Sequence, residues 1–446
     1  MGTTTTTTRR RRALGAAGAA LLAATVACTG SDGDGSRDDA GGPTTTTTSP
    51  YAHGWSAVHA DAANTDYSPV PGPSDLRLAW HRSLGGNINL GATTDSRGRV
   101  YVTTTAEGCH LYVLDAATGD TVWCSEEVDR FAVASSPLLD GDGRAFLADG
   151  EAMHAFGPDG EVLWEEPIVG VPLSAQFTPE GRVVFVTHVG MAYVLDRDTG
   201  EPLLPPVELV PGASFDPAAG MRGCPLGTAE CPSANTIAVD MATGRLFFTF
   251  WAPGAAAAGL RAMQYTEDPT PALTPLWTND RLPGGSASSP DLSPDGTRVY
   301  LNDNAGNVHA VDAATGEGIW AAPIGFVTGG SPSTSPAGVI IPAGGIGRTP
   351  VLALADEGAA ARELWRLDGT VSRGLTAQAA GDLAYAVVDA GEGSNDLLVL
   401  DTATGEELDR ERLPGRPVFT VGTTIGPDGT VYVPSINGEL YAYVED

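Results

Sequence analysis

The sequence predicts an all-β protein, an eight-bladed β-propeller whose last blade is closed by a strand from the N-terminal region. A unit of roughly 40 residues recurs along the chain, and each copy consists of short alternating apolar and polar runs separated by turn sequences. A tryptophan recurs at one place in most copies: Trp80, Trp123, Trp164, Trp277, Trp320 and Trp365. Strands, turn and tryptophan together indicate propeller blades, in which each ring docks on the next blade.

The turn that precedes the tryptophan strand has the pattern Asp-x-x-Thr-Gly. Its Asp side chain can accept hydrogen bonds from backbone amides two residues on, and its Gly supplies the positive φ that closes the hairpin. The pairs are Asp115 and Gly119, Asp196 and Gly200, Asp312 and Gly316, and Asp401 and Gly405. We predict a structural role for all eight. The Asp140–Gly143 sequence lacks the further acidic ligands of a calcium loop, so we interpret it as another turn.

The count of eight depends on joining the two ends of the repeat array. The last copy ends at Asp446 before its tryptophan strand, whereas the strand around Trp80 has no strands before it. Combining them makes one complete blade and removes the two sheet edges that an open array exposes. We therefore expect Trp80 to lie beside the strand around Tyr441–Val444.

The first residues are typical of an export signal. Arg9–Arg12 precede a short apolar run that ends in Thr25-Val26-Ala27-Cys28, which resembles a bacterial lipobox with Thr25 in place of the usual Leu. We expect residues 1–27 to be a lipoprotein-type signal peptide and Cys28 to be lipidated, with plain secretion as the alternative. Residues 28–50 are polar and low in complexity, which predicts a disordered tether before a propeller at 51–446.

Charge and cysteine use fit an exported protein. The net charge is −30, and lysine is absent from the sequence. Such a surface argues against nucleic acid and anionic lipid as partners and permits a basic or cationic partner. Four cysteines besides Cys28 allow three pairings; a hairpin favours Cys109–Cys124, which leaves Cys224–Cys231. The alternative of a metal site lacks the CxxC spacing and a nearby His, so we predict no metal.

Two copies carry the motif Tyr-x-x-Asp-x-x-Thr-Gly-x-x-x-Trp most closely, at Leu111–Trp123 and Val308–Trp320, the second with His309 in the Tyr position. The motif resembles the pyrroloquinoline-quinone (PQQ) repeat. The lead-in with Trp55, Asp61, Asn64-Thr65 and Tyr67-Ser68-Pro69 is similar to that of PQQ-repeat proteins, including dehydrogenases. The resemblance covers roughly residues 55–446. It implies a quinoprotein-like propeller that is either a quinone-dependent dehydrogenase or a non-catalytic binding protein.

The resemblance to dehydrogenases implies calcium-bound PQQ on the central axis, a catalytic Asp and often a disulfide between adjacent cysteines. The chain has no adjacent cysteines, and no Asp of this sequence matches the motif of the catalytic Asp. We therefore predict no catalytic residues and no cofactor. If a cofactor does bind, the sequence does not identify the residues that would hold it. His154 and His309 occupy a position that holds Tyr112 and Tyr193 in other copies, which favours a structural role. His53, His59 and His81 lie close together in the sequence, but a zinc site would need a further ligand and suitable spacing, so we do not predict one. The Ser-Pro sequences at Ser135–Pro137, Ser288–Pro290 and Ser335-Pro336 recur in phase with the repeat, which predicts that they mark entries to blades.

We therefore interpret the chain as a non-enzymatic cell-envelope lipoprotein whose monomeric propeller binds a protein partner, a layout that resembles BamB-like lipoproteins. The expected location is the extracytoplasmic face of the membrane, or outside the cell if Cys28 is not lipidated. A loop insertion at 205–233 is the preferred partner-binding part, because functional variation concentrates in loops. The alternatives are a PQQ-dependent dehydrogenase, with PQQ and calcium as its cofactors, and another enzyme built on a propeller.

Overall fold

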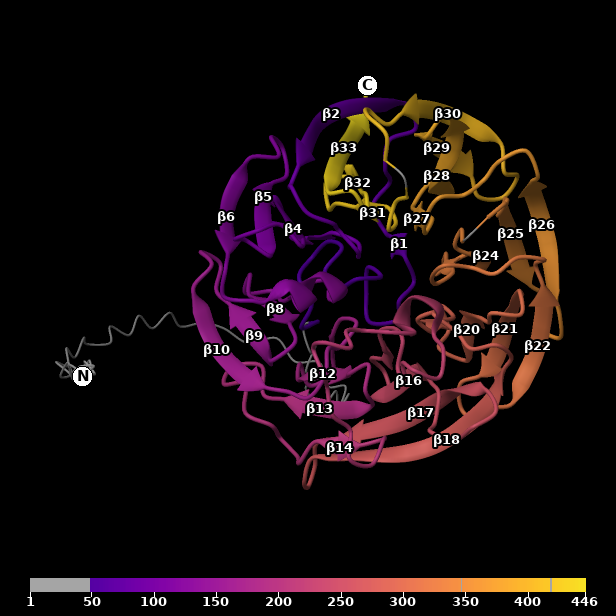
Figure 1. Ribbon diagram of the computed structural model, residues 1–446. Helices are drawn as coiled ribbons and strands as arrows, with labels where there is room; N and C mark the ends of the chain where they lie inside the picture. The colour runs from indigo at the N-terminus through magenta and orange to yellow at the C-terminus, as the bar shows by residue number, and fades with distance from the viewer. Residues whose placement is uncertain (1–48, 346, 418) are drawn as a thin grey trace, which may run out of the picture. The chain divides into compact units, whose positions relative to one another are not determined.

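Eight sheets surround a central axis in the computed structural model, which describes residues 49–446 except 346 and 418 (Figure 1). The signal peptide, Cys28 and nearly all of the expected tether lie outside the described residues. Each blade has four strands, listed from the axis outwards. Blades 1 to 4 consist of β3 (Thr93–Thr94), β4 (Arg99–Thr103), β5 (Leu111–Asp115), β6 (Thr121–Ser125); β7 (Leu138–Leu139), β8 (Ala145–Ala148), β9 (Ala152–Phe156), β10 (Val162–Pro167); β11 (Gln176–Phe177), β12 (Val183–Val186), β13 (Met191–Leu195), β14 (Val207–Glu208); β15 (Ala238–Asp240), β16 (Arg245–Phe250), β17 (Ala258–Thr266), β18 (Ala272–Leu282).

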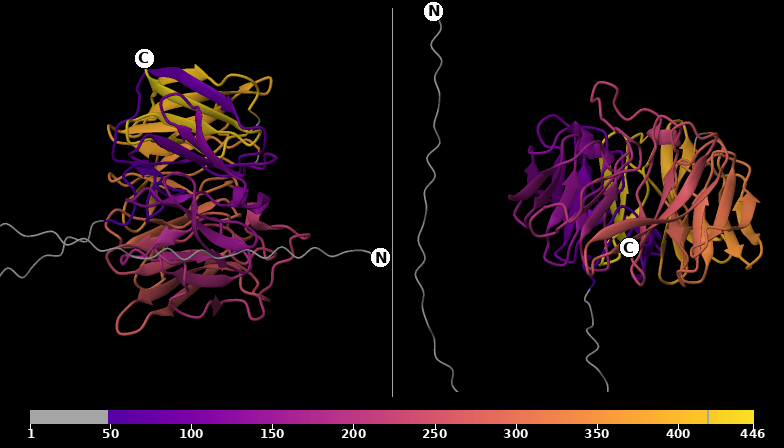
Figure 2. Two further views of the ribbon diagram at one scale, coloured as in Figure 1. Left: turned by 90° about the vertical axis from the view of Figure 1, so that its left-hand side faces the viewer. Right: turned by 90° about the horizontal axis from the view of Figure 1, so that it is seen from below.

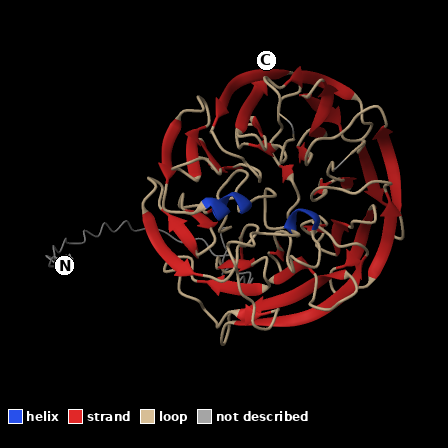
Figure 3. Cartoon of the chain, viewed as in Figure 1, coloured by secondary structure: helices blue, strands red, loops and turns tan. Residues whose placement is uncertain are grey.

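Blades 5 to 8 consist of β19 (Asp291–Leu292), β20 (Arg298–Asn302), β21 (Asn307–Asp312), β22 (Gly318–Pro323); β23 (Ser333–Thr334), β24 (Val339–Ile341), β25 (Val351–Asp356), β26 (Ala361–Leu367); β27 (Ala377–Ala379), β28 (Leu383–Gly391), β29 (Ser394–Asp401), β30 (Glu407–Arg412); β31 (Thr424–Ile425), β32 (Val431–Pro434), β33 (Glu439–Glu445), β2 (Leu76–Ser83). The additional strand β1 (Tyr67–Ser68) pairs with β27. Two short 3₁₀ helices, η1 (Arg130–Ala134) and η2 (Cys224–Leu226), lie towards the middle of the ring (Figure 3). No helix within the described ranges is long and apolar enough to cross a membrane.

The ring closes as the sequence predicts. β2 pairs antiparallel with β33, and Trp80 lies opposite Ala442. Figure 1 shows the indigo β2 completing the blade that the yellow C-terminal strands begin. The prediction of an eight-bladed PQQ-type propeller closed by an N-terminal strand is therefore confirmed.

Each recurring tryptophan docks on the turn of the following blade. The Trp80 indole N–H donates to the carbonyl of Ala116 at 2.8 Å, directly after the turn residue Asp115. A Cβ on Gly119 would lie 2.7 Å from the Trp80 ring, so this turn needs glycine for space as well as for its φ of 72°. The other indoles make the matching contacts: Trp123 with Pro158, Trp164 with Arg197, Trp277 with Ala313, Trp320 with the Asp356 carboxylate, and Trp365 with Thr402.

The two faces of the ring differ in the connections they carry. In an antiparallel blade, successive connections alternate between the two ends of the strands. The hairpins between the first and second strands and between the third and fourth form one face, here called the turn face. The hairpins between the second and third strands, with the links into the next blade, form the opposite face, here called the loop face. Figure 2 shows the ring from two sides.

Residues 50–70, the axial segment, run through the centre of the ring, where Figure 1 shows indigo chain. The backbone of this segment forms hydrogen bonds with the inner strands of six blades. Blade 3 is linked to it through the Gln176 side chain, which accepts from the Tyr51 hydroxyl and donates to the Asp61 carbonyl. The backbone partners are Ser56 with Leu139, Trp55 with Thr94, Ala62 with Val239, Ala63 with Leu292, Thr65 with Thr334, and Asp66 with Gln378. The lead-in is thus a central element that ties the blades together.

Candidate functional site

A cavity of about 380 Å³ lies on the propeller axis, between the axial segment and the links that lead into the blades. Because those links belong to the loop face, the cavity is on that side of the ring. Its walls are largely apolar, with side chains that include Leu90, Leu173, Leu375, Val421 and Ile436. An apolar cavity with a few convergent polar groups is the usual form of a ligand site.

A buried hydrogen-bond network lies at the axial-segment side of this cavity. His59 and Asp66 both line the cavity, and His59 Nδ1 lies 2.9 Å from Asp66 Oδ2. His59 Nε2 lies 2.9 Å from the Ser289 hydroxyl and 3.4 Å from that of Ser331. Of the two serines, Ser331 lines the cavity, and its Oγ also accepts from the Ser289 amide at 2.8 Å. In the tautomer in which His59 Nδ1 donates to Asp66, Nε2 accepts a hydrogen bond from the Ser289 hydroxyl.

Three acidic side chains, Asp61, Asp66 and Asp291, lie beneath the cavity. Burial raises the pKa of Asp66, although the nearby His59 opposes the shift. Burial likewise raises the pKa of Asp61, and it raises that of Asp291 well above the ordinary range, helped by the charges of Asp61 and Asp66. No arginine is among the described residues that line the cavity. The surroundings therefore disfavour an anion and favour a neutral or cationic group.

The loop insertion reaches this cavity. The structure places it between β14 and β15, at residues 209–237, so it starts later than the expected 205 because Val207 and Glu208 form the outer strand of blade 3. Met221, Cys224 and Pro225 of this insertion line the cavity. Within the insertion, the Cys224–Cys231 disulfide joins two residues whose Cα atoms lie 5.0 Å apart.

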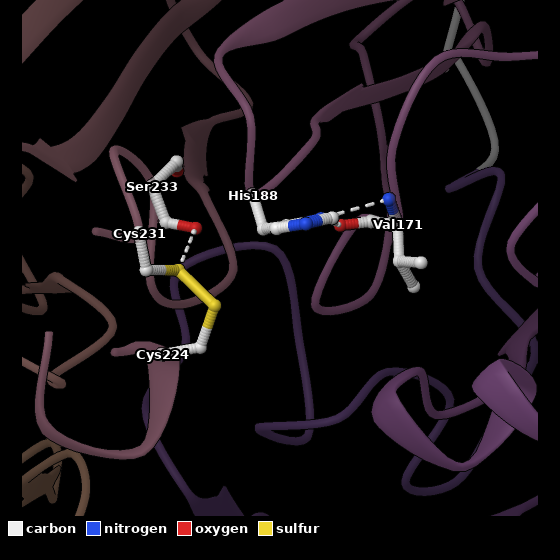
Figure 4. The surroundings of a disulfide bond; sticks show 5 residues. All are labelled: Val171, His188, Cys224, Cys231 and Ser233. Carbon is white, nitrogen blue, oxygen red and sulfur yellow. Dashed lines mark hydrogen bonds between the residues drawn. A yellow bond between two sulfur atoms is a disulfide. The ribbon is translucent and has the colours of Figure 1, made fainter. Parts of the chain in front are cut away.

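The same disulfide lies beside the link into blade 3. Figure 4 shows Cys231, whose sulfur contacts the Ser233 carbonyl at 3.4 Å, and the His188 ring, which extends to Val171. His188 Nδ1 accepts from the Val171 amide at 3.0 Å, and burial lowers the pKa of this imidazole. Phe215 of the insertion packs edge-on against His188, with ring centroids 5.0 Å apart. The insertion is thus packed against its own blade.

The structure confirms both expected disulfides, Cys109–Cys124 and Cys224–Cys231. His154 and His309 each contact an Asp in the hairpin of their own blade: Asp149 at 3.2 Å and Asp303 at 2.7 Å. These contacts support the structural interpretation. Among the described residues, no group of three or more His, Cys, Asp and Glu side chains is placed to hold a metal.

The three N-terminal histidines have separate environments. His53 lies beside the Asp95 turn of blade 1, and His81 on β2 contacts Glu439 of β33. Only His59 lines the axial cavity. No local pattern singles out His59, because its partner Ser289 is 230 residues away along the chain.

One interpretation of the serine motifs was wrong. Ser335 does not enter a blade: its carbonyl closes the turn after β23, accepting from the Gly338 amide. The entry to blade 6 is Ser331, which precedes β23 as Ser289 precedes β19. The in-phase serines do mark blade entries, yet two of them also contact His59. Recurrence alone could not show this second role.

Comparisons with known proteins agree with this architecture. A family model described as outer membrane protein assembly factor BamB matches residues 72–173 and 148–337. Protein Rv3035 of Mycobacterium tuberculosis is 31% identical over 399 residues, which cover 88% of this chain and 96% of that protein. The outer membrane protein assembly factor BamB of Burkholderia pseudomallei is 24% identical over 282 residues, 57% of this chain and 71% of that protein.

Solved structures show the same fold. BamB from Moraxella catarrhalis has a TM-score of 0.59 at 16% identity, with 83% of this chain and 99% of that chain covered. A quinohemoprotein alcohol dehydrogenase from Comamonas testosteroni has a TM-score of 0.59 at 15% identity, with 88% and 80% covered. At these identities the likeness concerns the fold, which binding proteins and enzymes share.

Proposed function

The chain belongs to the family described as outer membrane protein assembly factor BamB, and from this membership we propose that it is an exported, non-enzymatic scaffold that binds a protein partner through its loop face. BamB is by its printed name an assembly factor, which supports a role in contact with other proteins. An outer-membrane substrate is not part of the proposal.

One observation carries the choice of face. Four exposed large hydrophobic side chains lie in loop-face connections: Val169, Leu226, Val327 and Ile436, each 36–44% exposed. The other exposed large hydrophobics among the described residues belong to the outer strands β6, β10, β18 and β30. Apart from the outer strands, exposed large hydrophobics among the described residues thus lie on the loop face alone, which supports a protein-interaction surface there. The turn face instead carries the Asp residues of the repeated turns.

The point where the chain enters the propeller supports the same choice. The Pro50 carbonyl accepts from the Gly141 amide, in a hairpin of the turn face. We propose that residues 28–49 connect this face to a lipid on Cys28. The loop face is then free to meet a partner.

The alternative of a PQQ-dependent dehydrogenase fits the axial cavity poorly. PQQ carries several carboxylates, and binding them calls for cations or many amide donors. The described cavity lining has no arginine, and the buried Asp66 and Asp291 and the half-buried Asp61 lie nearby. We derive no step through this cofactor.

Site-specific photocrosslinking in the native envelope tests the proposal. A photoreactive amino acid is placed at Leu226 or Val169 on the loop face, and at Ala117 or Ala314 in exposed turns on the opposite face. We expect both loop-face positions to capture the same protein and the turn-face positions to capture none of it. Capture of one protein equally from both faces, or from the turn face alone, would contradict the proposal.

A further inference from the structure

We propose that the axial cavity binds a small organic cation, a protonated amine carried on an apolar body. This site is separate from the protein-binding function proposed above, and neither depends on the other. The inference starts from Asp66, a carboxylate on the cavity lining that is only 4% exposed.

Asp66 has one oxygen without a protein partner. Its Oδ2 contacts His59, whereas its Oδ1 has no hydrogen-bond partner among the described residues. Oδ1 is not among the fully buried polar atoms, so it is open to the cavity, where a charged donor would be its strongest partner. A ligand ammonium at Oδ1 would supply this donor.

Two other buried Asp–His pairs in the chain provide an internal comparison. Asp149 uses both oxygens: Oδ1 accepts from the Glu151 and Ala152 amides, and Oδ2 accepts from the Asp129 amide and contacts His154. Both oxygens of Asp303 are likewise bonded, to Ala305, Asn307 and His309. A structural pair in this fold therefore satisfies its carboxylate completely. The pair at Asp66 does not.

The walls and the volume of the cavity indicate what kind of body carries the amine. The walls are largely apolar, and about 380 Å³ is within the range of small-molecule sites. Ser331 adds a hydroxyl on the lining, close to His59. No arginine is among the described residues that line the cavity, and the chain contains no lysine whose own ammonium could occupy the site. An amine on an apolar body matches all of these features.

A matched series of three probes tests the charge requirement on the full mature protein. Phenylbutylamine, phenylbutanol and phenylbutanoate share one apolar body and differ in the head group. Isothermal titration calorimetry at pH 7 should show the amine binding about tenfold more tightly than the alcohol, the value of one charge-assisted hydrogen bond. The carboxylate should show no saturable binding. Carboxylate binding as tight as that of the amine would overturn the proposal.

Three variants locate the site. Asp66→Asn should lower amine affinity to that of the alcohol and leave alcohol binding unchanged, whereas Asp149→Asn, which alters the matched structural pair, should leave both unchanged. Ala134→Phe introduces a large side chain at another position on the cavity wall and should abolish both, which keeps the test valid if Asp66→Asn does not fold. Equal amine losses in Asp66→Asn and Asp149→Asn, or full binding by Ala134→Phe, would refute the site. Neither result bears on the photocrosslinks.

Discussion

Trp80 on β2 donates its indole N–H to the carbonyl of Ala116 at 2.8 Å, so the N-terminal strand that completes blade 8 is also fixed to blade 1. Trp80 is 6% exposed and packs against Tyr432 of β32. We expect Trp80→Ala to lower the free energy of unfolding by about 3–5 kcal/mol, as for other buried aromatic truncations. Urea denaturation followed by tryptophan fluorescence measures this. Val122→Ala, at an exposed outer-strand position, is the control and should change little.

A substitution at Gly119 tests the same contact at the turn against which Trp80 packs. Gly119→Ala introduces both a strained φ and a Cβ 2.7 Å from the Trp80 ring. Gly98 has a similar φ of 75° with no atom within 4 Å of an added Cβ, so Gly98→Ala introduces the strain alone. We expect about 1 kcal/mol of destabilisation for Gly98→Ala and at least about twice that for Gly119→Ala. Equal losses would show that the ring moves away without cost.

These turns and tryptophans could be predicted because their chemistry is local and repeats. Asp115 accepts from the Ala117 and Thr118 amides two and three residues on, so all the groups that stabilise this turn lie within the motif itself. The network of His59 with Ser289 and Ser331 could not be predicted. It arises because the axial segment crosses the ring and meets the entries to distant blades, a placement that no spacing in the sequence encodes. Ser331 and Ser335 both precede proline, so the sequence could not distinguish blade entry from turn.

Asp291 gives a prediction about pH. Burial raises its pKa well above the ordinary value, and neither carboxylate oxygen is hydrogen-bonded within the described residues. The folded state therefore holds this proton more tightly than the unfolded state, so stability falls as pH rises above about 4. Asp291→Asn removes that loss. We expect the variant to be about 1–3 kcal/mol more stable than the original at pH 8 and nearly equal at pH 4.5, in urea titrations. A constant difference across this range would contradict the assignment.

The ionised carboxylate of Asp149 contributes to folding stability, and this contribution is lost as pH falls, the reverse of the trend expected for Asp291. Although burial favours its protonated form, the His154 contact and backbone amides hold its pKa at about 2. The contribution of its charge to stability is complete above about pH 4 and is lost as pH falls towards 2. Asp149→Asn should therefore lower stability at pH 6 and lose its effect near pH 2. Thermal unfolding at the two pH values measures the difference, and a pH-independent effect would assign it to packing instead.

The disulfide in the insertion should act on the loop more than on the ring. Cys224 and Cys231 are seven residues apart, so a chain-entropy estimate gives at most about 2–3 kcal/mol from the bond. We expect Cys224→Ser with Cys231→Ser to keep the far-ultraviolet circular dichroism of the propeller while increasing amide exchange across residues 209–237. The measurement is hydrogen exchange with mass spectrometry. Unchanged exchange in the insertion would show that packing around Phe215 alone holds it.

Shortening the insertion tests whether the loop face binds a protein partner. A variant in which residues 211–231 are replaced by a short Gly-Ser linker keeps β14, β15 and the turn face. Crosslinking mass spectrometry on the native envelope then compares it with the unaltered chain. We predict that crosslinks from the loop face to the partner are lost while crosslinks between blades are retained. Partner crosslinks of normal abundance and position in the shortened protein would show that the partner does not bind through this part of the loop face.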